Sequence, residues 1–146
     1  MRSISMQEAI TEGLTQEMQQ DDSVHVFGED VVYGGLDDVT AGLRQRFGSE
    51  RVFDTPISES AMAGLAVGAA MMGTRPVVEM QFTGLITVAL DQIANSGAKA
   101  RYVHDGGLSA PMVVRTVTYP SGNVYVGQSL EAWVAHVPGL KVVAPS

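Results

Sequence analysis

Two acidic residues, Glu59 and Glu29, combine residue type and position in a way that suits acid–base chemistry. Glu59 lies in the stretch VFDTPISES (52–60), and the run behind it, AMAGLAVGAAMMG (61–73), carries no charge. Glu29 directly follows another apolar run, VHVFG, at residues 24–28. A carboxyl group at the lip of an apolar segment can hold a proton and share it with a bound base. The plain alternatives are an acid that stabilises a helix N-terminus for Glu59 and a solvated turn residue for Glu29.

The elements that must position these acids follow from the hydrophobic pattern. Ser5 and Glu8 fit a capping box, and apolar residues recur every four positions behind them, which predicts a helix over 6–20. Short Val-rich runs predict strands at 24–27, 51–55, 75–81, 110–119 and 141–146. The intervening segments predict helices at about 39–47, from 58 onward, at 85–102 and at 128–136. This alternation predicts an α/β fold, an open and mostly parallel sheet with helices on both faces.

Ligands of such open sheets bind outside the carboxyl ends of the strands. Residues 28–30, 55–59 and 81–84 fall at those ends in the predicted order. We therefore expect Glu29 and Glu59 to lie at the same edge of the sheet.

Composition excludes several classes of protein. The 146 residues suffice for about one domain, 45% of them are hydrophobic, and the net charge is −7. No cluster of Lys or Arg gives the footprint of a nucleic-acid binder, and the absence of Cys excludes disulfides and thiolate chemistry. The charge-free segment after Glu59 is too short to span a bilayer, so we expect a soluble, cytoplasmic domain without membrane or nucleic-acid partners.

Three further features were weighed as candidate sites. Gly64 and Gly68 put small residues on one helix face, which fits either tight packing within the domain or a subunit interface. His25, His104 and His136 lack the spacing of metal ligands, so no metal site is predicted. The Gly-containing segments lack the spacing of a phosphate-binding loop.

Taken together, the motifs resemble one family. These are GED after a strand, RVFDTPISES, GLAVGAAMMGTRPVVEMQF, DQIANSGAKARY and HVPGLKVVAPS, in this order. The chain is similar over essentially its whole length, 1–146, to the transketolase-like, N-terminal pyrimidine-binding domain of the beta subunits of thiamine-diphosphate-dependent 2-oxo acid dehydrogenases. That group includes pyruvate, branched-chain 2-oxo acid and acetoin dehydrogenases. Beta subunits of the family continue into a C-terminal domain that is absent here, so we expect the sequence to be part of a longer chain.

The resemblance implies a role for individual residues. Glu59 takes the position of the family acid that hydrogen-bonds N1′ of the cofactor's aminopyrimidine, and is the implied catalytic residue. Glu29, Ile57 and Phe82 would shape the pyrimidine pocket, and Leu85 and Gln128 would line it. The implied cofactor is thiamine diphosphate, with the diphosphate and magnesium held by an alpha subunit. The implied assembly is a heterotetramer of two alpha and two beta chains that passes the acyl group to a lipoyl-bearing acyltransferase.

Two departures from the family pattern concern the substrate side of the site. Leu85 stands where bacterial relatives have an aromatic residue, and Val126 and Gly127 replace a His-Ser pair of which only the following Gln128 is kept. These changes leave open a different substrate, another proton donor, weak activity, or a scaffold domain that pairs with an alpha subunit without turnover. The resemblance also implies a potassium site with one backbone carbonyl at Met112.

Overall fold

Four parallel strands form the sheet of this chain. The computed structural model describes residues 2–120 and 122–145, and its strands are β1 (Val24–Gly28), β2 (Val52–Asp54), β3 (Arg75–Phe82) and β4 (Val113–Val117). Their order is β2-β1-β3-β4, and each neighbouring pair is parallel. The predicted α/β fold with a parallel sheet is confirmed.

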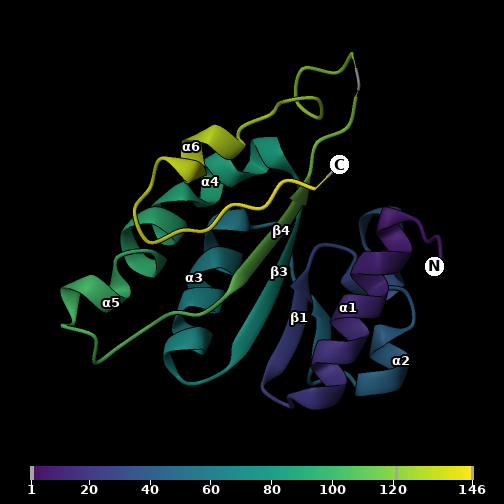
Figure 1. Cartoon of the computed structure of the whole chain (residues 1–146), viewed down its shortest axis with the longest axis horizontal. Helices are drawn as coiled ribbons and strands as arrows, with labels where there is room; N and C mark the ends of the chain where they lie inside the picture. Colours follow the sequence, from purple (N-terminus) through teal and green to yellow (C-terminus); the bar gives the residue numbers. More distant parts are fainter. Residues whose placement is uncertain (1, 121, 146) are drawn as a thin grey trace.

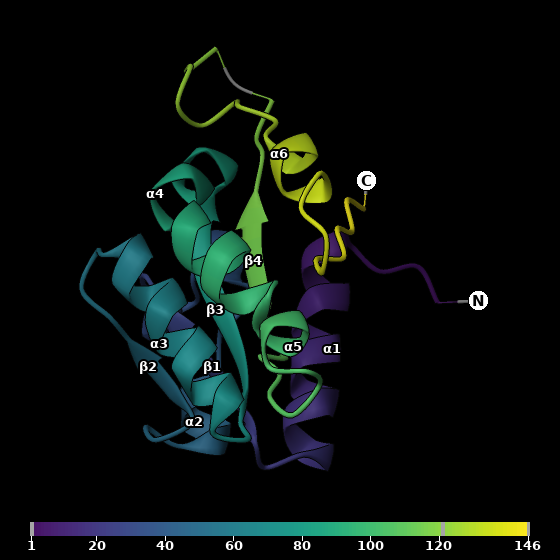
Figure 2. The ribbon, with the colours of Figure 1, turned by 90° about the vertical axis from the view of Figure 1, so that its left-hand side faces the viewer.

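Helices cover both faces of the sheet (Figures 1 and 2). On one side α1 (Met6–Gln20) and α2 (Leu43–Phe47) enclose a core around Val26 and Val52. On the other side α3 (Glu59–Met71) and α4 (Ile86–Asp91) enclose a core around Phe27 and Val78. Successive strand residues therefore point into opposite cores, because side chains alternate across a strand.

The first helix begins and ends as its sequence predicts. The Ser5 hydroxyl accepts a hydrogen bond from the amide of Glu8 at 3.1 Å, and the Glu8 carboxylate accepts one from the Ser5 amide at 2.7 Å. At the other end Arg51 donates to the backbone oxygens of Met18 and Asp21, each at 2.9 Å. The predicted capping box is confirmed, and the arginine satisfies carbonyls that the helix end leaves open.

Three predicted helices are shorter or more broken than expected. The helix predicted at about 39–47 is only α2, because Gly42 adopts a left-handed conformation (φ 78°) just before it. The helix predicted at 128–136 is only α6 (Glu131–Ala135). The helix predicted at 85–102 is divided into a 3₁₀ turn η3 (Thr83–Leu85), α4, a π-helical segment η4 (Gln92–Gly97) and α5 (Ala100–Val103). A Cβ on Gly97 would lie 3.3 Å from Val67, so this break lets the segment pack closely on α3.

The predicted fifth strand is wrong. Residues 141–145 are irregular, and Ser146, like Met1 and Ser121, lies outside the described residues. The preceding turn is fixed against the helices, because Gly139 (φ 98°) approaches Ala98 so closely that an added Cβ would lie 2.3 Å from its backbone oxygen. Leu140 packs on the core of the α3 side, whereas Val143 is 84% exposed. Within residues 2–120 and 122–145, no helix is long and apolar enough to cross a membrane.

Candidate active site

Glu29 and Glu59 lie at the same edge of the sheet, as the sequence predicts. Glu29 directly follows β1, and Glu59 is the first residue of α3. Both residues are buried, with exposed fractions of 4% for Glu29 and 8% for Glu59. The pKa of Glu29 is raised first by burial, then by the negative charge of Glu59 and then by that of Asp30. Two carboxyl groups from different strand–helix units therefore lie close enough for their charges to interact.

One oxygen of Glu29 has no partner within the chain. Among the described residues, Glu29 Oε1 and Thr55 Oγ1 are buried side-chain atoms without a hydrogen bond. The two residues occupy neighbouring strand ends, because the amide of Thr55 donates to the backbone oxygen of Gly28 at 2.9 Å. Thr74 Oγ1, just before β3, is a third buried atom of this kind and lies away from the candidate site. Buried polar atoms are nearly always hydrogen-bonded, so the Glu29 and Thr55 oxygens are available as partners for a polar group at this edge.

A shallow, open depression of about 530 Å³ lies beside Glu59. It is lined by residues 58–61 with Gly64, Val88 and Gln92. The Ser58 hydroxyl donates to the backbone oxygen of Pro56 at 2.9 Å and makes no capping hydrogen bond to α3. Within the described residues, the Glu59 carboxyl also has no hydrogen bond to a helix amide. It remains available to a ligand.

The two glycines of α3 lie in different surroundings. A Cβ on Gly64 would lie 3.3 Å from Gln92 Oε1, so this glycine allows close packing within the domain. Gly68 has nothing within 4 Å of such a Cβ, and it shares an exposed face with Leu65, which is 50% exposed. The packing alternative is confirmed at Gly64, and the interface alternative stays a prediction at Gly68.

A second group of predicted residues lies at the end of β3. A β-bulge between Glu79 and Phe82 shifts the register against β4, and Gln81 within it has a φ of 23°. Bulges of this kind re-aim side chains next to functional sites. The Gln81 side chain donates to Asp30 Oδ2 at 3.0 Å, which links this group to the Glu29 edge.

Threonine hydroxyls hold the pieces of this second group together. The Thr118 hydroxyl donates its hydrogen bond to the backbone oxygen of Gln128 at 3.2 Å. Because a hydroxyl has one hydrogen, the Thr83 hydroxyl is then the donor in its 2.7 Å contact with Thr118. A Cβ on Gly84 would lie 3.6 Å from Gln128 Nε2. Gln128 is therefore brought beside the turn that carries Leu85. Ile57 is not drawn into either group, since its side chain is 80% exposed in this chain.

The segment with the replaced His-Ser pair lies next to these residues. The backbone oxygen of Val126 accepts from the amide of Tyr119 at 3.4 Å, and the amide of Gly127 donates to Asn123 at 3.0 Å. His136, at the end of α6, and His104, after α5, are both exposed.

An ion pair that sequence reasoning missed lies under the site. Arg115 on β4 donates two hydrogen bonds to Glu79 on β3, at 2.5 and 2.6 Å, and the Glu79 side chain is 2% exposed. Burial raises the pKa of Glu79, and the charge and hydrogen bonds of Arg115 oppose that rise. The sequence does hold a signal for this pair. Glu79 lies inside the apolar run RPVVEMQ, and Arg115, of opposite charge, lies inside the apolar run MVVRTV.

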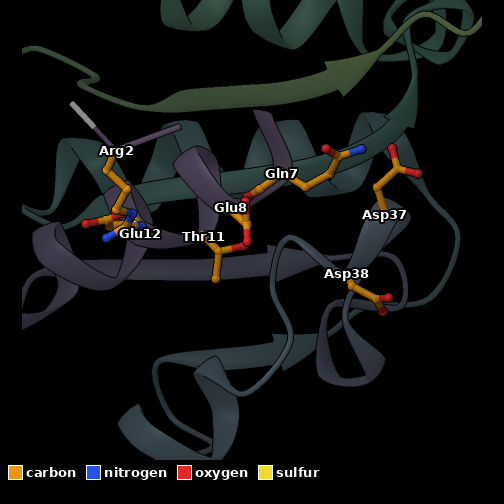
Figure 3. Close-up of a pocket in the computed structure, with 7 residues that line it drawn as sticks. All are labelled: Arg2, Gln7, Glu8, Thr11, Glu12, Asp37 and Asp38. Carbon is orange, nitrogen blue, oxygen red and sulfur yellow. The ribbon is translucent and has the colours of Figure 1, made fainter. Parts of the chain in front are cut away.

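A separate acidic depression lies between α1 and the loop that follows β1 (Figure 3). Its volume is about 460 Å³, and it is lined by exposed groups that include the Arg2–Glu12 ion pair, Asp37 and Asp38. It shares no residue with the depression beside Glu59, and it is not the candidate active site.

Comparisons with known proteins identify the family of this chain. Residues 2–146 match the family model described as the transketolase pyrimidine-binding domain. The 2-oxoisovalerate dehydrogenase subunit beta of Bacillus subtilis is 47% identical over 150 aligned positions, covering 100% of this chain and 46% of the relative. The pyruvate dehydrogenase E1 component subunit beta of Staphylococcus epidermidis is 44% identical over 151 positions, with the same coverage.

The fold also matches a solved structure, a split-gene transketolase described as an inactive beta4 tetramer. Its TM-score is 0.67 at 19% identity, and the match covers 94% of this chain and 41% of that one. The chain spans less than half the length of the curated relatives named above. Because the family model matches nearly the whole sequence, the chain belongs to the transketolase pyrimidine-binding domain family.

Proposed function

We propose that this chain supplies the pyrimidine-binding half of the active site in the beta subunit of a thiamine-diphosphate-dependent dehydrogenase that acts on a 2-oxo acid or on acetoin. The observation that carries the proposal is the buried pair of carboxyl groups, Glu29 and Glu59, with an unpartnered Glu29 oxygen beside it. The names of the similar relatives, subunits beta of pyruvate and 2-oxoisovalerate dehydrogenases, support the same activity.

Each site residue has a task in this proposal. Glu59 hydrogen-bonds the ring nitrogen N1′ of the aminopyrimidine, and its low exposure keeps water from competing for that contact. Glu29 accepts a hydrogen bond through its unpartnered oxygen. Phe82, Leu85 and Ile57 cover the ring with apolar surface, and Gln128 lies toward the substrate. When bound, thiamine diphosphate supplies the carbon nucleophile for the keto group and the electron sink that lets carbon dioxide leave.

The remaining parts of the site belong to other chains in this proposal. An alpha subunit holds the diphosphate and its magnesium, two alpha and two beta chains form the enzyme, and a lipoyl-bearing acyltransferase receives the acyl group. The described chain forms a single pyrimidine-binding domain, and the C-terminal domain of the family completes the subunit. A potassium ion bound partly by the backbone carbonyl of Met112 is a further part of the proposal.

The substrate side favours one competing function. Val126 and Gly127 occupy the place of the family's His-Ser pair, and His104 and His136 are exposed on other elements. A chain of this kind is compatible with a scaffold that binds an alpha subunit and cofactor without turnover.

A turnover assay separates the enzyme from the scaffold. The full-length chain is co-expressed with its alpha subunit and supplied with thiamine diphosphate and magnesium. Oxidative decarboxylation of pyruvate and of branched-chain 2-oxo acids, and oxidative cleavage of acetoin, are each followed by reduction of an artificial electron acceptor. The enzyme proposal predicts turnover of at least one substrate. Cofactor binding without turnover across this panel contradicts it and supports the scaffold.

A further inference from the structure

Tyr119 connects two parts of the molecule that are distant in sequence. It follows β4, and its ring meets the ring of Phe82 edge-on, with centroids 6.3 Å apart and planes inclined by 67°. Its hydroxyl donates a hydrogen bond to Asp37 Oδ2. One side chain therefore contacts a predicted pocket residue through its ring and the loop after β1 through its hydroxyl.

The loop that carries Asp37 is itself well anchored. Residues 30–42 leave the sheet directly after Glu29, and Asp30, Asp37 and Asp38 adopt left-handed conformations with φ between 56° and 63°. Thr11 on α1 donates to the backbone oxygen of Val39 at 3.0 Å, and Gln81 donates to Asp30 at the loop's start. In Figure 3 the carboxyl groups of Asp37 and Asp38 point in different directions. Asp37 is the acceptor of the Tyr119 hydroxyl. The loop is a fixed support for this hydroxyl.

Phe82 needs support of this kind because of its position. It lies immediately after the bulge, where Met80 and Gln81 together face Thr116, and its side chain is half-buried outside the apolar core clusters. Edge-to-face aromatic contacts orient rings as well as bury them. The Tyr119 ring is therefore the contact that fixes the direction of the Phe82 ring.

The hydroxyl of Tyr119 is a dependable donor. Burial, then the hydrogen bond to Asp37 and its charge, raise the pKa of Tyr119 to about 12, so the proton stays on the phenol at neutral pH. Hydrogen bonds from a neutral donor to a carboxylate are among the stronger ones in proteins. The backbone of Tyr119 is held as well, since its amide donates to Val126.

From these contacts we propose that Tyr119 is a positioning residue for the cofactor pocket, which holds the Phe82 ring against the pyrimidine while Asp37 anchors its hydroxyl. The inference rests on the proposed function, because it takes Phe82 as part of the pyrimidine pocket. It adds two residues, from the loop after β1 and from the segment after β4, that set how firmly the cofactor is bound.

The test compares the thiamine diphosphate concentration that half-saturates the protein, measured by isothermal titration calorimetry without substrate and again by turnover, in matched variants of the full-length chain assembled with its alpha subunit. Tyr119→Phe removes only the hydroxyl, and Asp37→Ala removes only its acceptor. Asp37→Asn keeps an acceptor oxygen and tolerates the left-handed backbone. Tyr102→Phe, at a tyrosine that is 88% exposed, and Asp38→Ala, at a neighbouring left-handed position, are the controls. Thermal unfolding of each variant checks that it is folded.

The expected result is a split between binding and turnover. Tyr119→Phe and Asp37→Ala should each raise the half-saturating thiamine diphosphate concentration about three- to tenfold, with kcat within about twofold of wild type. The double variant should show no further rise, and Asp37→Asn, Tyr102→Phe and Asp38→Ala should stay near wild type. Two results would overturn this inference alone, provided that wild type shows cofactor-dependent turnover. The first is an unchanged half-saturating concentration in Tyr119→Phe, and the second is additive effects in the double variant. Absence of cofactor-dependent turnover in wild type would overturn the proposed function and this inference with it.

Discussion

The carboxyl group of Glu29 lies close enough to Glu59 for the charge of Glu59 to raise its pKa. The two residues come from different strand–helix units, and the parallel sheet places both at one edge. The negative charge of Glu59 and burial both disfavour ionisation of Glu29, so Glu29 retains its proton more readily than an isolated carboxyl group.

Replacing Glu29 by Gln should stabilise the cofactor-free protein at neutral pH. The pKa of Glu29 is higher in the folded protein than its ordinary value, so the folded state binds the proton more tightly than the unfolded state. Stability therefore falls as the pH rises from the ordinary value through the raised one. Glu29→Gln removes this loss, and its melting temperature should exceed that of wild type at pH 8 by on the order of a few degrees.

The same variant provides its own control at low pH. Below about pH 4 both states of wild type carry the proton, so the gain from Glu29→Gln should largely disappear. Thermal unfolding at pH 4 and pH 8 measures the difference. A gain that is equal at both pH values, or a loss that grows with pH, is incompatible with a carboxyl group whose ionisation is disfavoured by the fold.

The Glu79–Arg115 ion pair should be costly to break and inexpensive to replace. Arg115→Met leaves a buried carboxylate without its partner, which costs about 3–5 kcal/mol. Glu79→Leu combined with Arg115→Met should recover most of that loss, because no unpaired charge remains. Urea denaturation of both variants measures the two free energies of unfolding.

An exposed ion pair gives the matched comparison. Arg2 and Glu12 approach to 2.7 Å, but their side chains are 68% and 40% exposed. Arg2→Met should change the free energy of unfolding by less than about 1 kcal/mol. The account of the buried pair fails if the Glu79→Leu/Arg115→Met double variant is as unstable as the sum of its single substitutions.

Gly28 should tolerate no side chain. Its φ is 148°, and an added Cβ would lie 2.2 Å from the backbone oxygen of Glu79, so β1 and β3 approach too closely for alanine. Gly28→Ala should cost more than about 2 kcal/mol. Gly13 lies inside α1 with nothing within 4 Å of an added Cβ, and Gly13→Ala should instead stabilise by about 0.5–1 kcal/mol. Chemical denaturation decides, and equal effects of the two substitutions would contradict the close approach at Gly28.

Local rules predicted the parts of the structure that depend on local contacts. The capping box of Ser5 and Glu8 could be predicted because both partners lie within one helical turn. The shared edge of Glu29 and Glu59 could be predicted because parallel strands end at one side of a sheet. Residue type alone left Glu59 open between catalysis and a helix N-terminus, and the catalytic role implied by the family resemblance stays a prediction.

The parts that were missed depend on contacts between distant segments. The Glu79–Arg115 pair requires the register of β3 against β4, and the Tyr119–Asp37 hydrogen bond requires the path of a loop. The π-helical segment η4 ends at Gly97, which packs closely on Val67 of α3, and the continuous apolar pattern of 85–102 does not show this contact. The segment predicted as a strand at 141–146 has a composition that suits a strand. However, the turn at Gly139 just before it packs against Ala98 in the helical layer, and not at the sheet.

The most direct test of the central claim, that Glu59 activates the cofactor, is the exchange rate of the C2 proton of thiamine diphosphate. The rate is measured by quenched deuterium exchange and NMR in the full-length chain assembled with its alpha subunit, for wild type, Glu59→Gln and the control Glu50→Gln, an exposed acid before β2. With cofactor bound at saturation, Glu59→Gln should slow exchange about 10²- to 10⁴-fold, and Glu50→Gln should match wild type. Exchange at the wild-type rate in cofactor-saturated Glu59→Gln would contradict the account.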